Sequence, residues 1–270
     1  QGHKRLRHRI VEVSSPEDGP QPSPLPAPMP QQPFNGRTVA VSGAGGSLGQ
    51  ALLRELHQQG ARLIALSSSP QPIALRAAAG DTIPLRQVSW QCGQEEALRP
   101  LLAEVDVLVL NHGVNVHGAR DAAAVLRSLE VNALSSWRLL ELFAELAGAD
   151  GPERAARELW MNTSEAEIQL ALSPLYEISK RLQGQLLSLR SLDLAGPQLR
   201  IRRLVLGPFR SALNPIGVMS AEFVAREVLR QASWDWGLVI VTPNPLTYLL
   251  MPLAALSRWL YFHVCSRPAG

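Results

Sequence analysis

Tyr176 and Lys180 are the side chains of this sequence best suited to proton transfer, and they occur together in the run YEISK. Residues four apart project from one face of a helix. A free phenol has a pKa of about 10 and exchanges protons poorly near neutral pH, but a nearby ammonium favours the phenolate and lowers that pKa. The pair could therefore give a proton to a carbonyl oxygen or take one from an alcohol.

The scarcity of lysine supports a special role for this position. Of the 26 basic residues only Lys4 and Lys180 are lysines, and the rest are arginines. A composition so biased should supply arginine wherever any cation suffices. We therefore expect the position of Lys180 to require an ammonium.

A glycine-rich turn, SGAGGSLG at residues 42–49, follows an apolar run and opens a segment of helical spacing. Glycines let a backbone approach a pyrophosphate closely, and a helix N-terminus offers free N–H groups and positive dipole to an anion. The residues of this turn that we expect to bind a dinucleotide are Gly43, Gly45, Gly46, Ser47, Leu48 and Gly49.

The cofactor preference is predicted from the end of the second apolar run, which reads LSSS at residues 66–69. NAD enzymes commonly place an acidic residue there to bind the ribose 2′-hydroxyl. Here no carboxylate would repel a 2′-phosphate, and the hydroxyls of Ser67 and Ser68 could donate to one. The sequence therefore favours NADP(H) over NAD(H).

Along the chain around these residues, apolar runs alternate with amphipathic segments. The expected strands are residues 37–41, 61–66, 85–90, 105–110, 159–163, 199–206 and 238–242, and the expected helices are 47–59, 95–104, 120–147 (one or two helices), 174–195 and 220–232. Alternation of this kind predicts an α/β fold: a Rossmann-like, doubly wound parallel sheet of about seven strands with helices on both faces.

With these motifs in this order, the chain resembles the single-domain type of the short-chain dehydrogenase/reductase family over about residues 36–243. The turn at 42–49 matches that family's T-G-x-x-x-G-x-G pattern, with Ser42 and Ser47 as departures. The other matching positions are Asn111 and Gly113 after the fourth strand, Asn132 in a helix, Ser164 after the fifth strand, Tyr176 with Lys180, and residues 207–211 (GPFRS).

The resemblance implies hydride transfer between a nicotinamide and a carbonyl carbon, and it implies a role for each matched residue. Tyr176 would be the acid and base, Lys180 would lower its pKa and bind the nicotinamide ribose, and Asn132 would hold a proton-relay water. Ser164 would stabilise the developing oxyanion, although the family's spacing also suits Thr163. Further cofactor contacts are implied for Asn111, Gly113, Gly207, Pro208 and Ser211. His112 and His117 are expected to be polar loop residues.

Two other functions are weighed against this one. A catalytically inactive dinucleotide-binding module, serving interaction or sensing, would have no need of a tuned phenol. Epimerases and dehydratases of the wider family usually carry a larger substrate domain, and few residues remain after residue 206.

Composition excludes several other classes of protein. The chain is 46% hydrophobic and 18% charged, with a formal charge of +3 that is concentrated in residues 1–9. A near-neutral body argues against nucleic-acid binding. Two cysteines exclude a disulfide scaffold and a four-cysteine zinc site, so no metal is expected. The predicted organisation is a basic, proline-rich linker or tail at 1–33, a dinucleotide-binding domain at 34–245, and an apolar C-terminal tail at 246–270.

The C-terminal tail leaves three arrangements open: a helix packed on its own domain or on a second copy, a helix in a membrane interface, or a membrane span interrupted by Pro252 and Arg258. The apolar loop at 212–219 favours a small apolar carbonyl or alcohol, lipid- or sterol-like, as the substrate. The expected location is cytoplasmic, with a peripheral membrane association open. The basic, proline-rich start also resembles the dehydrogenase half of bifunctional sterol desaturase/short-chain dehydrogenases.

Overall fold

The computed structural model describes residues 33–268. The basic, proline-rich segment predicted at 1–33 therefore lies outside the described residues, except for Pro33.

A single sheet of seven parallel strands forms the centre of this part of the chain, in the order β3-β2-β1-β4-β5-β6-β7. This confirms the predicted Rossmann-like α/β fold. The strands are β1 (Thr38–Ser42), β2 (Arg62–Ser67), β3 (Arg86–Ser89), β4 (Val107–Leu110), β5 (Arg157–Asn162), β6 (Leu199–Leu206) and β7 (Leu238–Val241). Their bounds differ from the expected ranges by one or two residues at most ends.

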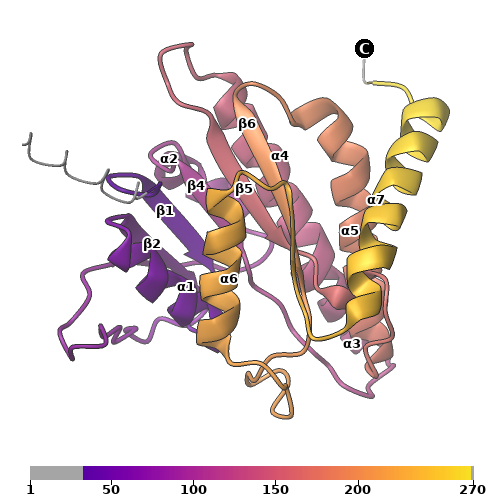
Figure 1. Cartoon of the computed structure of the whole chain (residues 1–270), viewed down its shortest axis with the longest axis horizontal. Helices are drawn as coiled ribbons and strands as arrows, with labels where there is room; N and C mark the ends of the chain where they lie inside the picture. The colour runs from indigo at the N-terminus through magenta and orange to yellow at the C-terminus, as the bar shows by residue number, and fades with distance from the viewer. Residues whose placement is uncertain (1–32, 269–270) are drawn as a thin grey trace, which may run out of the picture. The chain divides into compact units, whose positions relative to one another are not determined.

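Helices cover both faces of the sheet (Figure 1). They are α1 (Ser47–Gln58), α2 (Arg99–Leu102), α3 (Ala122–Leu129), α4 (Ser135–Gly148), α5 (Pro174–Leu194), α6 (Ala221–Ser233) and α7 (Pro245–Cys265), with short 3₁₀ turns η1 (Glu95–Leu98) and η3 (Glu165–Glu167) and a π-helical turn η2 (Glu130–Leu134). The side chains of α1 and α6 belong to one apolar core, and those of α2 and α4 belong to a second core on the opposite face.

The sheet forms because its central strands are apolar on both faces. All four residues of β4, VLVL, are buried, as expected for a parallel strand covered by helices on both sides. Trp160 of β5 is fully buried and packs edge-on against Phe34, with ring centroids 5.5 Å apart. The first described residues of the domain are thereby attached to the centre of the sheet.

The strand order reverses direction between β1 and β4, which are neighbours in the sheet although β2 and β3 lie between them in sequence. In open α/β sheets, ligands bind at the carboxyl ends of the strands beside such a point. The glycine-rich turn after β1 and the Asn111 segment after β4 both begin at this edge.

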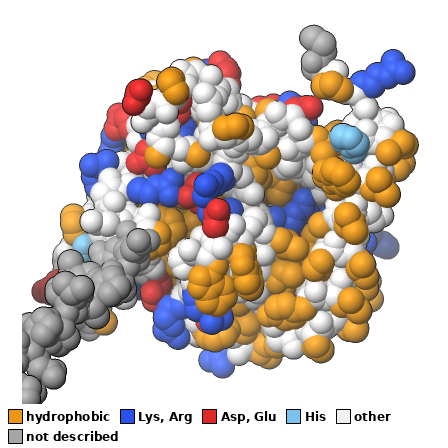
Figure 2. Space-filling model, turned by 45° about the horizontal axis from the view of Figure 1, so that its top comes forward, with side chains coloured by type: hydrophobic (Ala, Val, Ile, Leu, Met, Phe, Trp, Pro, Cys, Tyr) orange, Lys and Arg blue, Asp and Glu red, His pale blue; other side chains and the backbone are white. Residues whose placement is uncertain are grey.

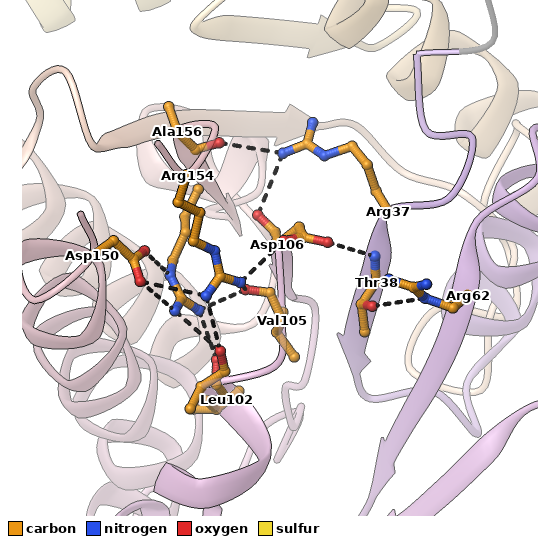
Figure 3. Close-up of polar contacts among 11 residues, drawn as sticks. Arg37, Thr38, Arg62, Leu102, Val105, Asp106, Asp150, Arg154 and Ala156 are labelled. Atoms are coloured by element: carbon orange, nitrogen blue, oxygen red, sulfur yellow. Dashed lines mark hydrogen bonds and ion pairs between the residues drawn. The ribbon is translucent and has the colours of Figure 1, made fainter. Parts of the chain in front are cut away.

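A polar cluster ties the opposite, amino-terminal edge together (Figure 3). Asp106, just before β4, accepts hydrogen bonds from the backbone N–H of Thr38 and from Arg154. The guanidinium of Arg157 is buried, pairs with Asp150 at 2.5 Å, and donates to the backbone carbonyls of Leu102 and Val105. The amino ends of β1, β4 and β5 are thus held by polar contacts, while their carboxyl ends carry the predicted site.

The C-terminal segment forms one continuous helix, α7, that packs against α5. It continues through Pro252, which lacks an N–H donor and so removes one helical hydrogen bond. Within residues 33–268, no helix is long and apolar enough to cross a membrane.

Replacing Asp150 by Asn tests the amino-edge cluster. Hydrogen bonding from Arg157 lowers the pKa of Asp150 below its ordinary 3.8. A lowered carboxylate pKa contributes stability that is fully present above the ordinary value and is lost as the pH falls through the lowered one. At pH 7 we expect Asp150→Asn to reduce the free energy of unfolding by about 1–3 kcal/mol, because it leaves a buried guanidinium without its anion.

Urea denaturation at several pH values measures this difference. It should stay constant from pH 7 down to about 4 and shrink below that. Equal stability of the variant and the wild type at pH 7 would contradict the assignment. Glu104→Gln, which removes an exposed ion pair with Arg86, is the control and should change little.

Candidate active site

Tyr176, Lys180 and Ser164 lie together beyond the carboxyl end of β5. The helix α5 starts at Pro174, and its first turns bring Tyr176 and Lys180 onto one face, with the lysine Nζ 5.8 Å from the centroid of the tyrosine ring. Burial raises the pKa of the Tyr176 phenol, and hydrogen bonding with the Ser164 side chain acts to lower it, so Ser164 lies beside the phenol. The spacing seen in the sequence therefore brings the three side chains into one site.

The ammonium of Lys180 is buried and is held from two sides. It donates to the backbone carbonyl of Asn162 at 2.8 Å and to the side-chain oxygen of Gln183 at 3.0 Å. Asn162 in turn donates through its side chain to that of Asn111, at 3.1 Å. The lysine is thus connected to the ends of both β5 and β4. The sequence analysis did not identify Gln183 as a partner of Lys180. Its position one helical turn after Lys180 is the feature that could have revealed it.

The protonation of the pair differs from the sequence-based expectation. Lys180 was expected to lower the pKa of Tyr176, yet burial raises that pKa and the contact with Ser164 lowers it only in part. Burial also lowers the pKa of Lys180 to about 7, although the charge of Glu167 acts to raise it. The physical reason is that both groups are enclosed by protein, which disfavours the charged form of each.

Ser164, and not Thr163, faces Tyr176. Thr163 is fully buried and its hydroxyl donates to the carbonyl of Leu204 in β6. Ser164 has φ 68° and ψ 156°, a backbone conformation that is essentially restricted to glycine. Such strain persists only where the surroundings enforce it, and it gathers at functional sites.

Asn132 lies in the π-helical turn η2 and is fully buried. Its side chain binds both backbone groups of Val114, accepting from the N–H at 2.7 Å and donating to the carbonyl at 2.9 Å. It also donates to Ser179, which neighbours Lys180 in α5. Asn132 therefore joins the segment after β4 to the helix that carries the tyrosine and lysine.

The glycine-rich turn divides into glycines that packing requires and glycines where an added Cβ would clash less. A Cβ on Gly43 would lie 2.9 Å from the backbone of His112, and one on Gly49 would lie 2.3 Å from the carbonyl of Gly43. Gly45 and Gly46 are exposed and have no such close neighbour. The first residues of α1, which include Ser47 and Leu48, have no side-chain cap.

This turn fits a dinucleotide pyrophosphate. Uncapped N–H groups at the start of a helix attract an anion, and two exposed glycines leave its approach free of side chains. The Ser47 hydroxyl donates to the carbonyl of Arg210, so the departure from glycine joins the turn to the loop after β6.

At the end of β2, the two predicted serines differ in exposure. Ser67 is buried and accepts a hydrogen bond from the N–H of Ser69, whereas Ser68 is exposed. Gly45 lies next to Ser67, since a Cβ there would be 3.8 Å from the serine oxygen. The serines therefore lie beside the glycine-rich turn, as a contact with the adenosine ribose requires.

The segment after β6 reaches the same edge of the sheet. Gly207 is required by packing, because a Cβ there would lie 2.3 Å from the hydroxyl of Thr242. Pro208 is exposed, and the Ser211 hydroxyl accepts a hydrogen bond from the N–H of Asn214 in its own loop.

His112 lies in the loop after β4, where its ring is held by neighbouring side chains. Its ring lies 2.8 Å from the Ser42 hydroxyl and packs edge-on against Trp90. Burial, together with the charge of Lys180, lowers its pKa to about 4, which keeps the ring neutral at physiological pH. Gly113 beside it is close to Asn132, whose oxygen would be 3.2 Å from an added Cβ.

Comparisons with known proteins agree with this geometry. Residues 39–166 match the NAD dependent epimerase/dehydratase family. Monoglucosyldiacylglycerol epimerase from Synechocystis sp. is 49% identical over 229 residues, which are 85% of this chain and 55% of that protein. The chain thus spans about half the length of this curated relative.

Two solved structures share the fold. A short chain dehydrogenase from Burkholderia cenocepacia, in complex with NADP, has a TM-score of 0.65 at 18% identity and covers 87% of this chain and 99% of its own. A bulky-bulky ketone specific alcohol dehydrogenase from Comamonas testosteroni has a TM-score of 0.69 at 17% identity, covering 87% and 97%. At these identities they show the fold alone, and the family match supports an SDR-like superfamily and an NAD(P)-dependent enzyme.

The buried lysine should leave a signature in the pH dependence of stability. Between its pKa of about 7 in the folded protein and 10.5 in the unfolded chain, the unfolded state binds more protons. Without nucleotide, the free energy of unfolding should therefore rise with pH in this interval, by up to about 1.4 kcal/mol per unit from this group.

Comparing Lys180→Met with Arg181→Met by urea denaturation at pH 7, 8 and 9 isolates the effect. The first variant should lose this contribution to the slope, and the second, an exposed neighbour, should keep it. Identical slopes in Lys180→Met and the wild type would show that this lysine does not titrate there.

Proposed function

We propose that the chain is an NADP(H)-dependent short-chain dehydrogenase/reductase that interconverts a carbonyl and an alcohol on an apolar substrate. The observation that carries the proposal is the meeting of Tyr176, Ser164 and Lys180 at the carboxyl edge of the sheet. That edge also holds the uncapped, glycine-rich start of α1. An acid–base group and an anion site at one edge suit hydride chemistry on a bound dinucleotide.

Each residue has a role in this proposal. Tyr176 exchanges the proton with the substrate oxygen, and Ser164 donates a hydrogen bond to that oxygen as negative charge develops. Lys180 places positive charge beside the phenol and binds the nicotinamide ribose. Asn132 holds the segment after β4 in place and supports the proton-relay water. When bound, the nicotinamide supplies or accepts the hydride.

The preference for NADP(H) rests on the absence of a carboxylate at 66–69 and on the exposed Ser68. The cradle for the pyrophosphate comprises Gly45 and Gly46 with the N–H groups of Ser47, Leu48 and Gly49. In this arrangement Asn111, Gly113, Gly207, Pro208 and Ser211 border the nicotinamide half of the cofactor.

An epimerase is the second candidate, because the curated relative at 49% identity bears that name. An epimerase of this chemistry oxidises an alcohol to a planar carbonyl and then reduces it from the opposite face. The site residues are the same, and the substrate would be the sugar of a glycosyldiacylglycerol. The length of the chain after β6 does not exclude this reaction, since the match extends over 85% of the chain.

The two candidates differ in their net use of cofactor. An oxidoreductase changes the amount of reduced nicotinamide in proportion to product, whereas an epimerase leaves it unchanged while the sugar inverts. Absorbance of reduced nicotinamide, followed together with NMR of the glycolipid, distinguishes them.

Two expectations from the sequence remain predictions. A pairing with a sterol desaturase half is compatible with the length of the curated relative, of which this chain covers 55%. A cytoplasmic location is compatible with the proposed use of NADP(H).

The chain would be an inactive dinucleotide-binding module if it binds nucleotide but converts no carbonyl, alcohol or glycolipid.

Tyr176→Phe tests the acid–base role. Loss of the phenolic proton should lower kcat by about a hundredfold or more, with nucleotide affinity nearly unchanged. Steady-state kinetics on a panel of apolar ketones and glycolipids gives the first quantity, and reduced-nicotinamide fluorescence gives the second. Trp234→Phe, an exposed aromatic at the end of α6, is the control and should retain activity. Full activity in Tyr176→Phe would refute the mechanism.

Ser68→Asp tests the cofactor preference. A carboxylate beside a 2′-phosphate should weaken NADPH binding by about tenfold and affect NADH binding much less. Fluorescence titration of both nucleotides measures the ratio, with Ser233→Asp as an exposed control outside the site. If the wild type binds NADH more tightly than NADPH, the preference is wrong.

A further inference from the structure

The helix α7 exposes most of its large apolar side chains, whereas a helix on the surface of a water-soluble domain usually buries them. Its side toward the protein carries Thr247, Met251, Ala255, Arg258 and Phe262, of which only Met251 and Phe262 are large apolar residues. A surface helix in water normally turns its apolar stripe inward and its polar residues outward.

The outward side of α7 is instead rich in large apolar and aromatic residues, all at least 40% exposed. They are Leu246, Tyr248, Leu249, Leu250, Leu253, Leu256, Trp259, Leu260, Tyr261 and Val264. Figure 2 shows hydrophobic side chains gathered on the right of the molecule, where α7 lies in Figure 1.

These exposed positions cover a wide arc of the helix. At about 100° per residue, they span about 220° of the circumference, and the inward residues occupy the remainder. One packed helix would cover a stripe about 100° wide. A continuous apolar medium therefore fits this side of α7 better than a single neighbouring helix does.

The charges around this surface suit an anionic bilayer. Residues 236–270 contain no Asp or Glu, while His263 and Arg267 are exposed near the end of α7. Tyr248, Trp259 and Tyr261 are of the types that lie at the level of lipid headgroups. Since no helix of the described residues is suited to crossing a membrane, the arrangement is that of a helix lying along its surface.

α7 is also fastened to the segment that carries Ser164. Immediately after that serine, Glu165 is bonded by Thr242 and Thr247, at the end of β7 and the start of α7. Glu167 is fully buried and pairs with Arg203 of β6 and Arg258 of α7. These contacts hold α7 close to Ser164 and the proposed active site.

Two loops near the carboxyl edge of the sheet also expose apolar side chains. Leu170 and Leu172, which follow η3, are 81% and 96% exposed, and Ile168 of the same loop packs toward Met251 of α7. In the loop after β6, Ile216 and Val218 are also exposed. Neither residues 168–176 nor 204–221 contain an acidic residue.

We propose that the outward side of α7, with the loops at 168–172 and 212–218, is a membrane-docking surface that sets the active site against the lipid bilayer. The docking would let an apolar substrate reach Tyr176 and Ser164 from the membrane without crossing water. This inference deepens the proposed function, and its substrate-delivery part rests on that function, whereas docking itself does not.

The test is flotation of the full chain with vesicles, in the absence of nucleotide and substrate. One set is phosphatidylcholine alone, and the other also contains phosphatidylglycerol. The wild type should bind both, and the anionic vesicles more tightly. Leu249→Ser/Leu253→Ser/Leu260→Ser, which removes three exposed side chains from the centre of the arc, should weaken binding to both by about tenfold or more.

The matched control is Phe223→Ser/Trp234→Ser/Trp236→Ser, which removes three exposed aromatics from outside α7 and should bind like the wild type. The basic residues of 1–9 are unchanged in every variant, so their attraction to anionic vesicles is the same in each. Circular dichroism and Tm check that each variant folds. Quenching by brominated lipid gives a second readout: it should be strong in the wild type and reduced in Trp259→Phe.

Two results would overturn the proposal. Equal vesicle binding by the wild type and the leucine variant is the first. The second is a wild type that does not bind vesicles and sediments as a dimer, while the leucine variant sediments as a monomer. That result would assign this side of α7 to contact with a second copy of the chain. Turnover of a short, water-soluble ketone separates loss of docking from failure of the proposed chemistry.

Discussion

The Lys180 ammonium is buried, and its hydrogen-bond acceptors fix the geometry around it. A buried charge is costly unless acceptors surround it, and here the carbonyl of Asn162 and the side chain of Gln183 provide them. To supply that carbonyl, β5 must end beside the first turns of α5. The same requirement brings the strained Ser164 to Tyr176, so one desolvated ammonium organises the two side chains proposed as the hydrogen-bond donor and the acid.

A second buried charge joins this centre to the outside of the molecule. Glu167 lies between Arg203 and Arg258. Burial lowers the pKa of Lys180, and the negative charge of Glu167 opposes that effect. Its carboxylate sits so close to α5 that a Cβ on Gly184 would be 2.3 Å from it. The close approach explains a glycine in the middle of a long helix, where it otherwise costs stability. The Glu167 carboxylate therefore contacts both α7, through Arg258, and α5, beside Gly184.

The arrangement suits the proposed enzyme, whose substrate would be held in a membrane. The proposed site lies at the carboxyl edge of the sheet, as in other open α/β folds, while the amino edge is held by the polar cluster around Arg157 and Asp150. The apolar side of α7 begins at the chemical edge, immediately after β7. A lipid could thus offer its polar headgroup to the site while its chains remain among apolar side chains.

The parallel α/β fold, the glycine-rich turn and the spacing of Tyr176 and Lys180 could be predicted from the amino-acid sequence, because each depends on local periodicity or short spacing. The different surroundings of Ser164 and Thr163 could not, since both follow β5 and only packing shows that Thr163 points into the sheet. The half-buried, neutral His112 and the Glu167 pairs also join residues distant in sequence. The orientation of α7 could not be predicted either, because the sequence periodicity indicates an apolar helix but not which of its sides packs on the domain.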